Sequence, residues 1–366
     1  ISFVIEENVY MLCPPEDTLT GMPHIFTIRE SPTHPHILPV TQISSGSMLG
    51  SLCLFESGSF VGLFLDYKDK IALCISQLLR LIGLSRKEKV VEYQKEFLYY
   101  WNKAATAAIK TRENRNFLSR YYLFLAKEFD GEWLNILDYP YGVIRLCSEA
   151  IKFNDEENII KSSRTWEALY LPIVDASEII PPTQEKPWGA EDIVDIICGV
   201  QRQRISPEMY RELLEHSYSK KAVVLIFRLN TLFFGCAVEF KNNGTAKFTV
   251  KVESQIEKVT PIHIERTDFS FLAAAIGNDA ELTYRKIAII GAGSLGSYVS
   301  EELVRSGIKD LTIVDFDEFE PANLLRHRLG YNFDIFTKAS GLSIKLKQIH
   351  PEIIVNPIEQ YIGAQN

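Results

Sequence analysis

The chain has 366 residues, which is enough for two or three domains of ordinary size. Its 46% hydrophobic and 23% charged residues are typical of a globular protein, and its net charge of −8 argues against a nucleic-acid partner. No apolar run approaches the roughly 20 residues of a membrane span, and no secretory signal is visible. We therefore expect a cytoplasmic protein without a membrane partner.

The cysteines stand at positions 13, 53, 74, 147, 198 and 236, and no two of them form a C-x-x-C pair. This spacing suits neither a disulfide framework nor a zinc site, so we expect reduced thiols. Four of these residues lie in apolar runs or beside a proline turn, and we interpret them as structural because free cysteine is commonly buried. They are Cys13, Cys74, Cys198 and Cys236.

The first 55 residues or so predict a small sheet. Residues 1–9 and 25–29 form apolar or alternating runs, and turn signals rich in proline and glycine separate them. A further strand-like run, residues 50–54, follows a Ser/Gly loop. It contains Cys53.

Two helices are predicted after these strands. The apolar pattern of residues 68–81 favours the first helix. Ser85 and Glu88 then form a capping box, which predicts one long helix that continues to Lys110.

This order of strands, a Pro35-His36-Ile37 segment, the Cys53 run and helices resembles the ubiquitin-conjugating enzyme fold in a divergent prokaryotic form. The resemblance implies that Cys53 is a catalytic cysteine that accepts an acyl group as a thioester. Alternatively, Cys53 is a small buried apolar residue. The family's His-Pro-Asn motif, whose Asn stabilises an oxyanion, is absent, although His34 or His36 could donate instead.

The middle of the chain carries no pattern to which we can assign chemistry. Residues 181–187 are rich in proline and are the best candidate for a linker. Ser206 and Pro207 are typical of a helix start. The remaining patterns predict two helices and three strands, at residues 190–200, 207–217, 222–229, 232–240 and 246–253. We interpret this region as a linker or docking domain.

The most informative stretch begins with an apolar strand at residues 286–290. It continues as Gly291-Ala292-Gly293-Ser294-Leu295-Gly296, followed by a helical run and a second strand that ends at Asp315. Strand, glycine turn, helix, strand and acid form the dinucleotide-binding pattern. The glycines allow backbone N–H groups to approach a phosphate at the helix N-terminus, and Asp315 can accept a ribose hydroxyl.

The residues after Asp315 separate adenylating enzymes from hydride-transfer enzymes. The chain reads D-F-D at Asp315, then N-L-L-R from Asn323 to Arg326, then Lys338. This resembles the ThiF/MoeB and ubiquitin-activating enzyme superfamily. The resemblance implies that Asp315 binds the ribose, that Asn323 and Arg326 contact the nucleotide, and that Lys338 meets the phosphates. An arginine fork and a lysine charge suit a departing pyrophosphate.

The predicted site therefore has two parts. The nucleotide-binding residues are Gly291, Gly293, Ser294, Gly296, Asp315, Asn323, Arg326 and Lys338, and the catalytic residues are Cys53, Arg326 and Lys338. The resemblance implies ATP and Mg²⁺ as cofactors. It also implies a magnesium-binding Asp, zinc-binding Cys pairs and a transfer cysteine beyond Asn366, so we interpret the chain as a fragment.

We expect an α/β and α+β multidomain protein. Residues 1–125 are predicted as the ubiquitin-conjugating-like α+β domain, residues 126–275 as the α+β linker domain, and residues 276–366 as an incomplete, Rossmann-like, doubly wound ThiF-type domain. The predicted reaction is ATP-dependent activation and thioester transfer of a ubiquitin-like protein, or of a nucleotidyltransferase C-terminus as in bacterial CBASS operons, to a target protein. A homodimer through the adenylation domain is expected.

Three alternatives remain open at this point. The protein could be an adenylyltransferase for a sulfur carrier or small molecule, with an N-terminal half that only binds a partner. It could be an NAD-dependent oxidoreductase, although Asn323, Arg326 and Lys338 speak against that. It could also be a non-catalytic scaffold.

Overall fold

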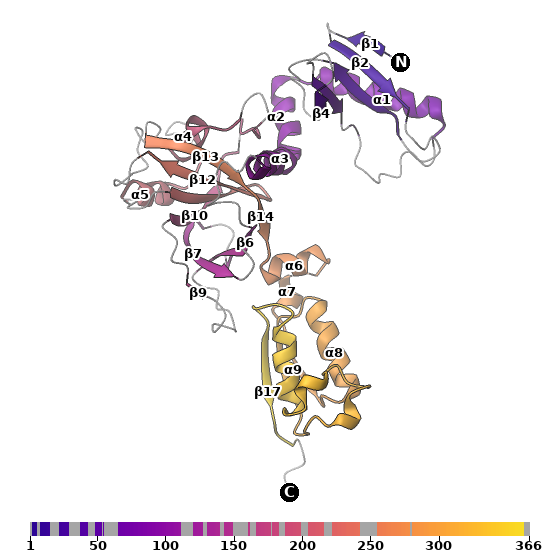
Figure 1. Ribbon diagram of the computed structural model, residues 1–366, viewed down its shortest axis with the longest axis vertical. Coiled ribbons are helices and arrows are strands. Elements are labelled where there is room, and N and C mark those ends of the chain that lie inside the picture. Colours follow the sequence, from indigo (N-terminus) through magenta and orange to yellow (C-terminus); the bar gives the residue numbers. More distant parts are fainter. Residues whose placement is uncertain are drawn as a thin grey trace. The chain divides into compact units, whose positions relative to one another are not determined.

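The structure, a computed structural model, divides into two compact units (Figure 1). One unit contains Ile1–Thr111 and Asp175–Asp195, and the other contains Arg112–Val174 and Ile196–Asn366. Within the described part of the chain, no helix is both long and apolar enough to span a membrane. The described residues are 2–5, 8–14, 22–28, 37–42, 48–52, 54, 65–110, 120–126, 130–139, 143–148, 160–161, 166–176, 178–182, 187–198, 204–215, 222–241, 255–278 and 280–361.

The first unit contains an antiparallel sheet in the order β1-β2-β3-β5-β4, as far as its residues are described. Helix α1 (Tyr67–Ile82) matches the predicted helix, and it packs its buried Cys74 and Leu78 against Tyr10 and Ile25 of this sheet. Cys53, His34 and His36 lie outside the described residues. The strands are β1 (Ser2–Ile5), β2 (Asn8–Cys13), β3 (His24–Ile28), β4 (Ile37–Gln42) and β5 (Met48–Leu52).

The single long helix predicted up to Lys110 is wrong, because two consecutive helices occupy this stretch. The capping box of Ser85 and Glu88 opens α2 (Arg86–Lys95), as predicted. Glu96 leaves the helical conformation, and α3 (Phe97–Lys110) begins directly after it. Both helices contact one further segment of the chain, each through its own side chains.

That further segment is Asp175–Asp195, which belongs to the same unit. Trp188 packs edge-on against Trp101 of α3, with ring centroids 5.0 Å apart. The side-chain amide of Gln94 donates to the carbonyl oxygens of Ala176 and Ile179, at 2.7 and 3.0 Å. The predicted linker, residues 181–187, begins with the buried Pro181 and Pro182, whereas Pro187 at its other described end is exposed.

The second unit contains a large mixed sheet in the order β13-β12-β11-β10-β7-β8-β6-β14, with β9 beside β7. Strands β10 and β11 are parallel, as are β6 with β8 and β6 with β14, and the remaining pairs are antiparallel. These strands are β6 (Arg120–Phe124), β7 (Glu132–Tyr139), β8 (Val143–Cys147), β9 (Ile160–Lys161), β10 (Trp166–Ile173), β11 (Ala222–Leu229), β12 (Leu232–Phe240), β13 (Ile256–Ile262) and β14 (Ile264–Arg266).

Strands β11 and β12 have the bounds that the sequence predicts, since both are almost continuously apolar and buried. They meet at a tight turn in which Asn230 has a φ of 56°. The predicted helices are confirmed as α4 (Ala190–Cys198) and α5 (Pro207–Glu215), with Ser206 capping the latter. The predicted strand at residues 246–253 lies outside the described residues.

The sheet passes directly into the C-terminal region. After β14 come the short helices α6 (Phe269–Ala275) and α7 (Ala280–Thr283). A parallel sheet in the order β15-β16-β17 follows, which confirms the predicted α/β character of this part. Helices α8 and α9 connect its strands and bury a shared apolar core with them. The elements are β15 (Lys286–Ile290), α8 (Ser294–Arg305), β16 (Asp310–Val314), α9 (Lys338–Lys347) and β17 (Ile354–Ile358).

The domain boundaries 1–125, 126–275 and 276–366 stay predictions. Strand β6, which lies within the first of these ranges, pairs with β8 and β14 in the large sheet.

The glycine turn between β15 and α8 gives the first testable prediction. A Cβ atom at position 296 would overlap the backbone carbonyl of Gly291, whereas a Cβ at position 293 has no atom within 4 Å. We expect Gly296→Ala to lower the free energy of unfolding by about 1–3 kcal/mol, since backbone cannot move aside as a side chain can. Gly293→Ala is the matched control and should destabilise the protein less, by about 0.5 kcal/mol, because alanine is a poorer N-cap than glycine but meets no clash here. Equal urea midpoints for the two variants would contradict this packing.

Candidate functional site

The glycine turn leaves the N-terminus of α8 open. Gly291 has a φ of 89°, a conformation that favours glycine. Gly293 is the N-cap residue of α8 and has no side chain that could accept a hydrogen bond. It therefore leaves the first backbone N–H groups of the helix uncapped. Open space also surrounds the position that a Cβ of Gly293 would occupy. This arrangement fits an anion such as a phosphate.

Asp315 follows strand β16 and braces this turn. Its Oδ2 atom accepts from the backbone N–H of Ala292 at 2.6 Å, and its Oδ1 atom accepts from the backbone N–H of Asp317 at 2.8 Å. Each carboxylate oxygen has two lone pairs, so Asp315 can still accept a further hydroxyl. The side chain therefore has a structural role in addition to the predicted ribose contact.

Asn323 and Arg326 are brought together by a 3-10 turn, η6 (Pro321–Asn323). Asn323 is buried, and its Oδ1 atom accepts from the Arg326 guanidinium at 3.3 Å. Its side-chain amide also donates to the carbonyl of Glu320 at 3.2 Å. Arg326 itself is exposed, and a guanidinium has five N–H donors, so it can also bind an anion.

Lys338 is the first residue of α9 and already has a carboxylate partner. Its Nζ atom lies 2.7 Å from Oδ2 of Asp317, and its backbone N–H donates to the Asp317 carbonyl at 2.9 Å. Only 9% of Lys338 is exposed, so the pair fixes the position of the ammonium group. Sequence reasoning did not assign a role to Asp317, although it is the second acid of the D-F-D motif.

His327 was also missed by the sequence interpretation. Its Nδ1 atom accepts from the backbone N–H of Leu329 at 3.0 Å, so this nitrogen carries no proton. Nε2 is then the protonated nitrogen, and it donates to the carbonyl of Ala292 at 2.6 Å. Burial lowers the pKa of His327, and the ring packs against Phe319. The neutral His327, which directly follows Arg326, thus joins its own segment of the chain to the glycine turn.

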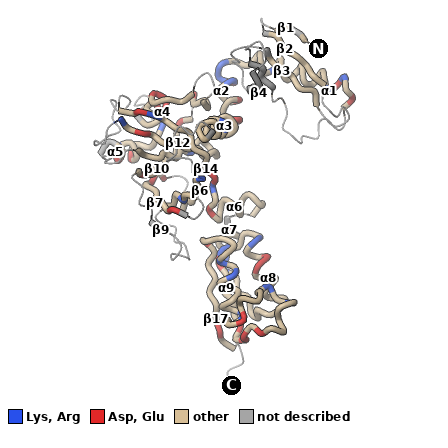
Figure 2. Tube along the Cα trace, viewed as in Figure 1, with Lys and Arg blue, Asp and Glu red and all other residues tan. Residues whose placement is uncertain are grey.

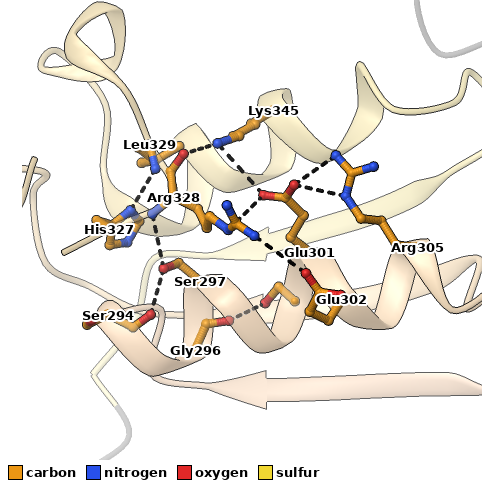
Figure 3. A network of polar contacts seen from close by, with 11 residues as sticks. Ser294, Gly296, Ser297, Glu301, Glu302, Arg305, His327, Arg328, Leu329 and Lys345 are labelled. Carbon is orange, nitrogen blue, oxygen red and sulfur yellow. Dashed lines mark hydrogen bonds and ion pairs between the residues drawn. The ribbon is translucent and has the colours of Figure 1, made fainter. Parts of the chain in front are cut away.

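Helix α8 also contacts the segment that contains His327 and Arg328 (Figure 3). The hydroxyl of Ser294, the first residue of α8, donates to the carbonyl of Arg326 at 2.5 Å. The structure therefore joins the predicted nucleotide-binding residues in three ways. It links Asp315 to the glycine turn, Ser294 and Asn323 to Arg326, and Lys338 to the D-F-D motif. It does not describe Cys53.

The described residues contain no group of three or more His, Cys, Asp or Glu that could hold a metal ion. They do not by themselves form the expected magnesium or zinc site, and both metals stay predictions.

Comparison with known proteins now identifies this part of the chain. A model of the ThiF family matches residues 272–366. These residues form a ThiF family domain. The ThiF domain begins within α6 and contains every described residue of the predicted nucleotide site.

Two curated relatives illustrate how far the similarity extends. The ATP-dependent ubiquitin transferase-like protein Cap2 of Pseudomonas aeruginosa is 29% identical over 188 residues, which cover 47% of this chain and 34% of that protein. The tRNA threonylcarbamoyladenosine dehydratase of Haemophilus influenzae is 38% identical over 88 residues, which cover 24% of this chain and 34% of that protein. The chain thus spans about a third of the length of each.

Solved structures are similar over about a quarter of the chain. The E. coli MccB structure with ATP has 28% sequence identity and a TM-score of 0.23, and the match covers 26% of this chain and 27% of that chain. The E. coli TcdA structure with ATP has 25% identity and a TM-score of 0.24, and the match covers 25% of this chain and 40% of that chain.

The lowered pKa of His327 gives the second prediction. Burial is its main cause, Lys338 and Lys345 add to it, and Asp315 and the bond to Ala292 oppose it. The unfolded chain then binds a proton more readily than the folded chain, so stability is complete above pH 6.5 and is lost as the pH falls through the folded pKa.

Ring ¹⁵N NMR should show a neutral Nε2–H tautomer for His327 at pH 7, with His327→Gln providing the assignment. Between pH 7.5 and 5.5, the unfolding midpoint of the wild type should fall further than that of His327→Gln. A His327 pKa above 6.5 would contradict the geometry.

Proposed function

We propose that this chain is part of an enzyme that uses ATP to adenylate the C-terminal carboxylate of a protein. The substrate would be a ubiquitin-like protein or, as in CBASS operons, a nucleotidyltransferase. The observation that supports adenylation most directly is the convergence of Arg326 and Lys338 on the edge of the sheet that also carries the glycine turn and Asp315. An arginine and a lysine near a helix N-terminus suit a triphosphate better than a dinucleotide.

The proposed binding mode assigns one task to each group. The backbone N–H groups at the start of α8 would hold phosphate oxygens in the open space beside Gly293. Asp315 would accept a ribose hydroxyl while it keeps its bonds to the turn. Asn323 would orient the Arg326 guanidinium.

The proposed reaction is an attack of the substrate carboxylate on the α-phosphorus of ATP. A carboxylate oxygen–phosphorus bond forms, the bond from the α-phosphorus to the bridging oxygen breaks, and pyrophosphate leaves. Negative charge develops on the leaving pyrophosphate, where Arg326 and Lys338 would stabilise it. Asp317 would release or share Lys338 as the phosphates arrive, because a phosphate carries more charge than one carboxylate.

The conjugation step also belongs to this proposal. A cysteine thiolate would attack the acyl carbon and displace AMP, and the acyl group would then pass to Cys53 and to a target amine. The similarity to Cap2, an ATP-dependent ubiquitin transferase-like protein, supports transfer as well as activation. A homodimer through the ThiF domain is part of the same proposal.

A second candidate is an adenylyltransferase without conjugation, in which the N-terminal half binds a partner. The tRNA threonylcarbamoyladenosine dehydratase match favours it, since the identity is higher at 38% and covers only 24% of the chain. The two candidates differ in the reactivity of Cys53.

The third prediction concerns Arg326. In the full-length protein, Arg326→Ala should lower the rate of substrate-dependent ATP–pyrophosphate exchange by about 10²-fold or more, since an always-charged donor to the leaving group is lost. Arg285→Ala is the matched control and should exchange normally, because Arg285 precedes β15, at the opposite end of the strand from the glycine turn, and pairs with Glu281. Tight NADH binding without any exchange would refute the assignment.

The fourth prediction concerns Cys53. Incubation with ATP and the substrate protein should give a thiol-sensitive adduct on non-reducing gels, and Cys53→Ala should remove it from the N-terminal half of the protein. Cys74→Ala is the control, because Cys74 is buried in α1, donates to the Pro23 carbonyl, and has its pKa raised by burial to about 11. If Cys53→Ala keeps the adduct and target conjugation, the second candidate is favoured.

A further inference from the structure

Residues 326–328 are attached to helix α8 at successive turns, and Figure 3 shows the contacts of Arg328 with this helix. Ser294 donates to the carbonyl of Arg326 at 2.5 Å, and the backbone N–H of Arg328 donates to the hydroxyl of Ser297 at 3.3 Å. Ser294, Ser297 and Glu301 are three and four residues apart, so they share one face of the helix. Glu301 therefore occupies the third position of this attachment.

The Glu301 side chain is only 6% exposed, and three cations surround its carboxylate. Arg305, one turn along the same helix, donates to it at 2.9 and 3.0 Å. Arg328 lies 3.3 Å from its other oxygen, and Lys345 of α9 lies 3.8 Å from the same oxygen. A buried carboxylate requires such partners, so Glu301 fixes the cations as much as they fix Glu301.

Arg328 is fixed from several directions. Its guanidinium lies over the ring of Tyr298 at 4.3 Å and donates to Glu302 at 3.4 Å, and the ammonium of Lys345 donates to its carbonyl oxygen. Figure 2 shows the blue and red segments that these opposite charges produce on α8 and α9. The backbone on the C-terminal side of His327 is thus held between the two helices.

The side chain of Arg326 has fewer contacts than that of Arg328. Its guanidinium is exposed and contacts Asn323 at 3.3 Å. The direction in which Arg326 points is therefore set by this one contact and by its backbone. Helix α8 holds that backbone at the Arg326 carbonyl through Ser294, and at Arg328 through Ser297 and Glu301. Lys338 differs from Arg326, because Asp317 holds its ammonium group directly.

We propose that Glu301 is a positioning residue for Arg326. Through Arg328, the buried Glu301 carboxylate holds residues 326–328 along α8 and aims the Arg326 guanidinium at the phosphates. The proposal rests on the adenylation proposed above, and it assigns to Glu301 no contact with nucleotide or substrate.

The test uses the full-length protein and compares Glu301→Gln with two matched variants. Glu302→Gln removes the neighbouring carboxylate, whose 3.4 Å contact with Arg328 should contribute little because Glu302 is 62% exposed. Arg305→Gln removes a Glu301 partner that lies outside the tethered segment. In ATP–pyrophosphate exchange, Glu301→Gln should lower kcat by roughly tenfold to a hundredfold with little change in the KM for ATP, because misplacing one charged group affects mainly the transition state. Both matched variants should stay within about twofold of the wild type.

A double-mutant cycle separates positioning from folding. In an Arg326→Ala background, Glu301→Gln should reduce exchange by less than about twofold further, since its target is already absent. Arg328→Gln, which breaks the same ion pair from its half-exposed partner, should reproduce the loss if Glu301→Gln unfolds. The backbone amide of Arg328 should also exchange hydrogen faster in both single variants, while the amides of β16 stay protected.

Several results would overturn the inference. Equal kcat for Glu301→Gln and Glu302→Gln would do so, as would an undiminished loss in the Arg326→Ala background, which would mean a structural role alone. In both cases the wild type exchanges pyrophosphate and adenylation stands. A wild type that binds ATP but never exchanges pyrophosphate with its substrate overturns adenylation itself, together with the role given to Glu301.

Discussion

Both backbone polar groups of Ala292 are held by side chains from other segments. Its N–H donates to Asp315 at 2.6 Å, and its carbonyl accepts from His327 at 2.6 Å. Asp315 directly follows the neighbouring parallel strand β16, and His327 directly follows Arg326. The buried Ala292 is therefore the point at which the glycine turn, Asp315 and the segment after the N-L-L-R motif meet. If either contact were lost, a buried backbone group would be unsatisfied, which costs about 1–3 kcal/mol.

The same histidine geometry recurs where the large sheet passes into the ThiF domain. His350 accepts on Nδ1 from the backbone N–H of Glu352 and contacts the carbonyl of Thr267 through Nε2 at 2.7 Å. Glu352 in turn accepts from the N–H of Phe269 and from Lys309. Burial lowers the pKa of His350, as it does for His327. In both places a neutral ring joins two backbone segments that are distant in sequence, so the connection after β14 is fixed by the same chemistry as the site.

The sequence predicts best where the signal is local. The bounds of β11 and β12 follow from two continuous apolar runs, and the capping box fixes the start of α2. The strands of the aromatic stretch between residues 120 and 173 were not predicted individually. Strands β6 and β10 pair with β14 and β11, which are far away in sequence, although β7 and β8 are adjacent in the chain and pair with each other. The break at Glu96 was missed for a related reason, since Trp188 packs against α3 across more than eighty residues.

In the candidate site too, local sequence patterns were predicted and contacts between distant residues were not. The glycine turn and Asp315 follow from spacing, because the chemistry of a phosphate and a ribose requires those residues in that order. The roles of Asp317 and His327 depend on which atom each side chain reaches, and neither spacing nor composition contains that information. A signal did exist for Asp317, as a second acid in D-F-D beside a distant lysine. None existed for His327, because a histidine between two arginines is equally compatible with a solvated loop.

Lys338 and Arg326, the two cations of the candidate site, are held in position in different ways. Lys338 is nearly buried and held by Asp317, so its position is set before any nucleotide binds and little reorganisation is needed when charge develops. Arg326 is exposed, and its guanidinium donates to Asn323, so in the proposed reaction it could adjust to the phosphates as they enter. A fixed lysine and an adjustable arginine would complement each other there. Lys338 would fix where the phosphates lie, and the Arg326 guanidinium could follow the pyrophosphate as it separates.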